Sequence, residues 1–216
     1  MPSRFIWQPN AGATGRYRDK VTGRFVSGKA VRDELDNFLD NSTDPTKTLA
    51  DSLREGGASV RDWETGMRRL VKNTHLTAIA EERGGWANMT QADFGRAGQI
   101  IREQYGYLND FAGEIASGEF VLDGRLEARS NLYVKAGRES FYKSKQAHAI
   151  ANDLGFVKSK LNPADHCDEC VKFNGVWYEI GDSAYKLPGQ RQCLANCKCT
   201  EIYGTMVDGV IVEVGA

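Results

Sequence analysis

Between residues 28 and 155, hydrophobic side chains recur every three or four positions, the spacing of a helix with one buried face. This spacing predicts a mostly helical body of about five helices. The first covers about 28–41, and the others begin near Pro45, after Ser59, after Thr90 and after Asp123, the last with a break near Gly137.

Polar residues and glycines mark the ends of these helices. Ser59 with Asp62, and Thr90 with Asp93, have the spacing of a capping box. Asp44 is expected to cap the short second helix. The helix after Thr90 should bury one stripe of side chains: Phe94, Ala97, Ile101, Tyr105, Leu108, Phe111 and Ile115.

The pattern changes on either side of the body. Residues 156–216 are rich in glycine, aromatic and β-branched residues, and short strands are expected at 177–178, 199–203 and 210–214. Residues 1–27 combine glycine, arginine and turn formers, which indicates an extended arm with a short strand at 24–26. The predicted fold class is therefore α+β: an arm (1–27), a helical body (28–155) and a small β module (156–216).

Composition places the chain among globular proteins. It has 216 residues, of which 41% are hydrophobic, enough for one large domain or a helical domain with a small appendage. No apolar run approaches the ~18 residues of a membrane span. The start, MPSRFIWQPN, lacks a secretory pattern, so we expect synthesis in a reducing cytosol.

Charge is unevenly distributed although the net charge is only −1. The first 32 residues are basic, and residues 33–55 are mainly acidic. Such an arm could contact nucleic acid or an acidic protein surface, or be an ordinary solvated tail. The candidate binding residues are Arg16, Arg18, Lys20 and Arg24.

All five cysteines lie in two short runs, HCDEC at 166–170 and QCLANCKC at 192–199. A reducing compartment and an odd count argue against a disulfide framework and favour metal binding. Structural zinc takes four ligands in a tetrahedron, and two pairs of cysteines would form a zinc ribbon. The candidate ligands are Cys167, Cys170, Cys193, Cys197 and Cys199, with His166 as a sixth.

The spacing favours some of these candidates. Cys167 and Cys170 form a CxxC, a pair often found in a tight turn, and Cys197 is expected together with either Cys193 or Cys199. A redox CxxC and plain core packing are the alternatives, but a redox site would need a βαβ context. An all-thiolate site has no open position for water, which argues against catalysis.

Other catalytic patterns are absent from the sequence. It contains no HExxH, no P-loop, no GxSxG, and no GxGxxG opening a helix after a strand. His75 and His148 each stand alone in a helical stretch, so a structural role is expected for both. The sequence predicts no active site.

The C-terminal run CDEC…NGVWYEIGD…LPG…NCKCTEIYG resembles the tail of phage head morphogenesis proteins. These are minor head proteins similar to protein F of phage Mu and to the portal-associated minor capsid protein of SPP1. The family combines a helical body with a CxxC and a closing N-C-[RK]-C strand, which Asn196–Cys199 matches. The helical body also looks similar, including the run Tyr105, Tyr107, Leu108 and Phe111.

One departure affects the ligand set. The family commonly has His-Pro before the last CxC, where this chain has Leu194 and Ala195. Cys193, one residue earlier, would then replace the histidine. The resemblance covers about a quarter of the chain.

The resemblance implies a non-enzymatic virion protein, made in the host cytoplasm and built into the capsid near the portal vertex. It would take part in head assembly, and in DNA packaging or ejection. Its partners would be the portal protein, the major capsid protein, further copies and packaged DNA, and no membrane. The main alternative is a zinc-ribbon nucleic-acid-binding protein, although the β module is acidic on balance. An enzyme with an added toxin domain would need a longer chain.

Overall fold

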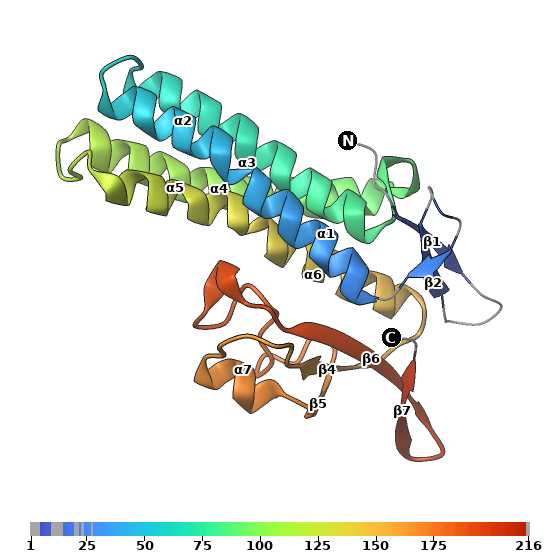
Figure 1. Cartoon of the computed structure of the whole chain (residues 1–216). Helices are drawn as coiled ribbons and strands as arrows, with labels where there is room; N and C mark the ends of the chain where they lie inside the picture. Colours follow the sequence, from blue (N-terminus) through green and yellow to red (C-terminus); the bar gives the residue numbers. More distant parts are fainter. Residues whose placement is uncertain (1–4, 10–14, 20–21, 23, 27, 215–216) are drawn as a thin grey trace.

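The computed structural model describes residues 5–9, 15–19, 22, 24–26 and 28–214. A helical bundle is followed by a small antiparallel sheet, so the predicted α+β class is confirmed (Figure 1). The bundle consists of α1 (Gly28–Asn41), α2 (Thr43–Arg54), α3 (Val60–Glu82), α4 (Gln91–Ala116), α5 (Gly124–Lys135) and α6 (Gly137–Ala151). A 3-10 turn, η1 (Trp86–Asn88), joins α3 to α4.

Both expected capping boxes are present. The Ser59 hydroxyl accepts a hydrogen bond from the Asp62 backbone N–H, and Thr90 and Asp93 do the same at the start of α4. These bonds satisfy backbone donors that a helix start leaves unpaired. The expected cap of α2 is wrong by two residues, because the N-cap is Ser42. Asp44 lies inside the first turn, where its negative charge favours the helix N-terminus.

The predicted break near Gly137 separates α5 from α6. A Cβ atom at Gly137 would lie 2.9 Å from Thr74 Cγ2 and 3.0 Å from Leu39 Cδ2. Only glycine therefore lets the start of α6 approach α1 and α3 this closely.

The bundle has a separate hydrophobic core formed by α2, the first half of α3, the second half of α4, and α5. Trp63 and Phe111 are fully buried, with ring centroids 5.5 Å apart in an edge-to-face arrangement. Phe94, expected on the buried stripe of α4, is 44% exposed. Near the N-terminus of α4, a smaller cluster forms instead, in which Ala97 and Ile101 pack against Ile79 of α3.

The C-terminal sheet has the strand order β5-β4-β6-β7, and every neighbouring pair is antiparallel. Three strands overlap the expected ones: β5 (Trp177–Glu179), β6 (Thr200–Val207) and β7 (Val210–Val214). The fourth strand, β4 (Phe156–Lys160), and the short helix α7 (Asp168–Phe173) were not predicted. Figure 1 shows the β6–β7 hairpin extending away from the bundle.

The N-terminal segment differs from the extended arm that its composition indicates. Its described residues form a three-stranded antiparallel sheet of β1 (Phe5–Pro9), β2 (Gly15–Asp19) and β3 (Phe25–Val26). The strand expected at 24–26 is present as β3. Pairing of β2 with both β1 and β3 makes the described part of this segment a small sheet rather than an extended arm.

One hydrophobic cluster joins the bundle to the C-terminal sheet. It unites Leu35 and Tyr142 of the bundle with Val157, Phe173 and Tyr203 of the module. The module therefore shares its core with α1 and α6. Among the described helices, none is both long and apolar enough to cross a membrane.

Candidate metal centre

The first cysteine pair lies on a short helix. Cys167 is the N-cap of α7 and Cys170 lies in its first turn. Residues three apart in a helix share one face, and the two sulfur atoms are 3.5 Å apart. This geometry differs from the tight turn in which such a pair is often found.

The second set surrounds a single 3-10 turn. Cys193 and Cys197 flank η2 (Leu194–Asn196), and Cys199 directly precedes β6. Leu194 has a left-handed backbone with φ of 45°. The turn is closed by a hydrogen bond from the Cys197 N–H to the Leu194 carbonyl, 3.1 Å long. The chain therefore doubles back and directs its thiols toward α7.

Cys170 is the centre of the cluster. Its sulfur lies 3.5 Å from the Cys167 and Cys193 sulfurs and 3.6 Å from that of Cys197. Around a tetrahedral ion with metal–sulfur bonds of about 2.3 Å, sulfurs are about 3.8 Å apart. Cys170, Cys197 and Cys199 are at most 1% exposed, and all five cysteines are free.

His166 adds an imidazole to this cluster. Its Nδ1 lies 3.8 Å from the Cys199 sulfur, and its Nε2 lies 2.6 Å from the Asn162 carbonyl oxygen. A carbonyl can only accept, so Nε2 carries the proton and Nδ1 keeps a lone pair for a metal. Two groups of donors have metal-binding spacing: Cys167, Cys170 and Cys193, and His166, Cys170 and Cys199. These residues could hold a metal ion, and Cys170 belongs to both groups.

Hydrogen bonding polarises the thiols. The Cys199 thiol donates to Cys197, which lowers the pKa of Cys197 and raises the pKa of Cys199. A thiolate is the form of cysteine that binds metal. Within this pair, Cys197 is therefore the thiol that ionises more readily.

The redox alternative finds part of its required context. The CxxC does open a helix that follows strand β4. The sheet, however, is antiparallel on both sides of β4, so the described residues form no βαβ unit there. Three further cysteines lie in the same cluster, which fits metal ligation better than a dithiol exchanging with a substrate.

Several residues that support the cluster were not predicted. The Tyr142 hydroxyl donates to the Cys199 carbonyl oxygen over 2.8 Å, and Asn162 Nδ2 donates to the Lys198 carbonyl oxygen over 2.6 Å. The guanidinium of Arg191 lies against Cys170. Sequence spacing carries no signal for these contacts, because they join segments up to 57 residues apart.

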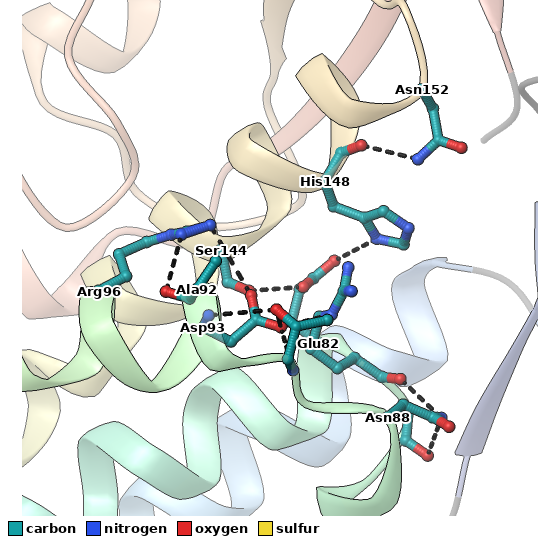
Figure 2. A network of polar contacts seen from close by, with 11 residues as sticks. Glu82, Asn88, Ala92, Asp93, Arg96, Ser144, His148 and Asn152 are labelled. Carbon is teal, nitrogen blue, oxygen red and sulfur yellow. Dashed lines mark hydrogen bonds and ion pairs between the residues drawn. The ribbon is translucent and has the colours of Figure 1, made fainter.

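The two helical histidines lie elsewhere, in polar clusters between helices. His75 is fully buried, with Nδ1 2.7 Å from the Ser140 hydroxyl, and burial lowers its pKa to about 4. Figure 2 shows Glu82 accepting from the Ser144 hydroxyl, with His148 Nδ1 3.2 Å away from the same carboxylate. Ser144 and His148 each contact the Glu82 carboxylate directly, whereas in a catalytic triad the histidine lies between the serine and the acid. The contacts instead connect the end of α3 to α6.

The candidate binding residues of the N-terminal segment fall on or beside its sheet, as far as that segment is described. Arg16 and Arg18 lie on β2, and Arg24 is exposed just before β3. Lys20 lies outside the described residues.

Comparison with known proteins adds no relative. The chain matches no protein-family model, no curated protein and no solved structure. The assignment of function therefore depends on the site and on the sequence motif.

Proposed function

We propose that this chain is a structural protein in which one zinc ion fastens α7 to the η2–β6 segment, and so holds together the C-terminal module that packs on the helical bundle. The observation that carries this proposal is the closed thiol cluster around Cys170. Cys170, Cys197 and Cys199 are almost inaccessible to solvent, whereas a catalytic zinc keeps an open position for water or substrate. A small sheet also needs such a staple, because it buries little core of its own.

Metal analysis of the purified chain tests this part. About one zinc per chain is expected, and a chain that binds no metal would overturn it. Single variants Cys193→Ser, Cys199→Ser and His166→Gln then identify the fourth ligand. Replacement of a true ligand should lower the affinity for the metal, and replacement of a cysteine ligand should also weaken the thiolate-to-cobalt absorption of the Co²⁺-loaded chain. The variants at the other positions serve as matched controls.

We further propose that the protein is a minor head component of a phage virion, located near the portal vertex. This assignment rests on the motif between Cys167 and Cys199, which resembles phage head morphogenesis proteins. It would be made in the host cytoplasm and would assist head assembly, and DNA packaging or ejection. Its partners would be the portal protein, the major capsid protein and other copies of itself.

The β6–β7 hairpin is the surface best suited to such docking. Val207, Val210 and Val212 are 47%, 65% and 45% exposed. An exposed apolar strand at the edge of a sheet favours pairing with another chain. In the virion this strand would be covered by the portal or the shell.

Nucleic-acid binding by the module is the less favoured function. Three of its lysines are held in ion pairs: Lys158 with Glu213, Lys186 with Glu169, and Lys198 with Asp36. Arg191 is buried. Few cations of the described module therefore remain to contact phosphates.

Mass spectrometry of purified virions tests the phage assignment, since the chain should be present at a fixed stoichiometry. Val210→Glu should reduce incorporation by charging the hairpin. Val121→Glu is the matched control, because Val121 is 60% exposed and lies between α4 and α5. Absence of the wild-type chain from virions would contradict the assignment, and equal incorporation of both variants would exclude the hairpin as the docking surface.

A further inference from the structure

The side chain of Arg191 is fully buried beside the cysteine cluster, with 0% exposure. One terminal nitrogen donates to the Ser159 hydroxyl over 2.8 Å, and the other to the Tyr185 hydroxyl over 3.2 Å. Nε donates to the Lys186 carbonyl oxygen over 3.0 Å. The guanidinium also lies over the rings of Phe173 and Tyr185, 5.0 Å and 5.6 Å from their centroids. Its position is thus fixed on all sides.

Besides the Tyr185 hydroxyl, the acidic group that the guanidinium contacts among the described residues is a thiol. Its terminal nitrogen lies 3.9 Å from the Cys170 Sγ. Among the described residues, Arg191 forms no ion pair with a carboxylate. Glu201 is linked to Arg191 through the Tyr185 hydroxyl, which donates to Glu201 over 3.0 Å, and the charges of Glu201 and Glu169 act on Arg191 without direct contact.

A buried cation without a counter-charge is costly, because several kcal/mol of hydration are lost per ion. Neutral thiols would not offset that cost. Thiolates on a divalent ion would, since one divalent cation with four thiolates carries a net charge of −2, and with three thiolates and a neutral histidine a net charge of −1. Cys170, the thiol nearest the guanidinium, belongs to both candidate ligand groups.

We infer that Arg191 is the outer-sphere counter-ion of the metal centre, donating an N–H···S hydrogen bond to the metal-bound sulfur of Cys170. This inference rests on the proposed metal site. Arg191 acts as a positioning residue: it binds no metal, but it neutralises part of the thiolate charge and fixes the sulfur's orientation. Ser159 on β4 and Tyr185 hold it in place, so the sheet itself sets the geometry.

The test compares Arg191→Met with the wild type for Zn²⁺ affinity and for the spectrum of the Co²⁺-loaded chain. Methionine fills much of the space between the two rings without a charge. We expect a 10- to 100-fold loss of zinc affinity, the usual effect of removing an outer-shell partner. We also expect the thiolate-to-cobalt charge-transfer band to move to lower energy, because an unbonded thiolate gives up an electron more easily.

Metal-free stability separates this role from mere packing. Without metal the guanidinium has no thiolate partner, so Arg191→Met should destabilise the apo protein less than the metal-bound protein. A purely structural arginine would lower the stability of both forms equally and leave the cobalt band unmoved. Lys186→Met removes a half-exposed lysine of the same segment and is the matched control, expected to change affinity less than about threefold.

Each outcome has one meaning. A wild-type chain that binds neither Zn²⁺ nor Co²⁺ refutes the metal site and the inference with it. A wild-type chain that binds metal, with an Arg191→Met variant of equal affinity and unshifted band, refutes the inference alone. If Arg191→Met does not fold, Arg191→Lys replaces it: lysine keeps the charge but loses the planar fork, so a smaller shift in the same direction is expected. An unshifted band in that variant overturns the inference.

Discussion

Removal of one buried hydroxyl tests whether the bundle and the cysteine loop are mechanically joined. Tyr142 of α6 is 1% exposed, and its hydroxyl donates to the Cys199 carbonyl oxygen over 2.8 Å. Burial raises the pKa of Tyr142, so the hydroxyl stays protonated and remains a donor at any ordinary pH. Tyr142→Phe keeps the ring, and its edge-to-face contact with Phe141 at 5.3 Å, but leaves the carbonyl without this donor.

The expected cost follows from that unpaired carbonyl. Leaving a buried acceptor unsatisfied lowers the free energy of unfolding by about 1–3 kcal/mol. With a urea m-value of about 2 kcal/mol/M, the unfolding midpoint should fall by roughly 0.5–1.5 M. Urea titrations should be run at a fixed zinc concentration, because a ligand of the native state shifts the midpoint.

Tyr107→Phe is the matched control, since Tyr107 is 63% exposed. Its free energy of unfolding should stay within about 0.5 kcal/mol of the wild-type value, as for most surface changes. If Tyr142→Phe is as stable as Tyr107→Phe, the hydroxyl does not hold the loop, and the proposed coupling between bundle and metal centre is wrong.

Four further substitutions test the bundle. Gly137→Ala should destabilise the protein by about 1–3 kcal/mol, because the new methyl group would meet Thr74 Cγ2 at 2.9 Å. Gly106 has open space around it, so Gly106→Ala should stabilise the protein by about 0.5–1 kcal/mol. Thermal unfolding that ranks the two variants in the other order contradicts the packing described. Trp63→Ala should cost about 3–5 kcal/mol in urea unfolding, and a loss below about 1 kcal/mol would show that its core is not formed. His75 has a folded pKa of about 4 against 6.5, so its neutral form contributes stability above pH 6.5 that is lost as pH falls toward 4, about 3 kcal/mol in all. His75→Gln should therefore lose about that much less stability on acidification, and a parallel pH profile would refute this assignment.

The helices could be predicted because their signals are local. Ser59 with Asp62, and Thr90 with Asp93, are close in sequence and form the same hydrogen bonds that their spacing predicts. The apolar stripe of α4 was predictable only where another helix covers it, and the exposure of Phe94 marks the limit of periodicity.

The features that were missed depend on partners distant in sequence. Strand β4 has only two apolar residues, Phe156 and Val157, and it is defined by pairing with β5 and β6 on either side. The cysteine cluster could be located from spacing, whereas its supports could not. Tyr142 and Arg191 are ordinary residues in the sequence and become part of the site only through the tertiary fold.

The hydrophobic cluster shared by α1 and the C-terminal sheet imposes an order on biosynthesis. Val31 and Leu35 are covered by residues as late as Tyr203. At ribosomal speeds of about 5–20 residues per second, the hydrophobic face of α1 stays incompletely covered for roughly 8–35 s after it is made. A nascent chain of this design should attract a chaperone during that interval, and it can complete its core only when translation is nearly over.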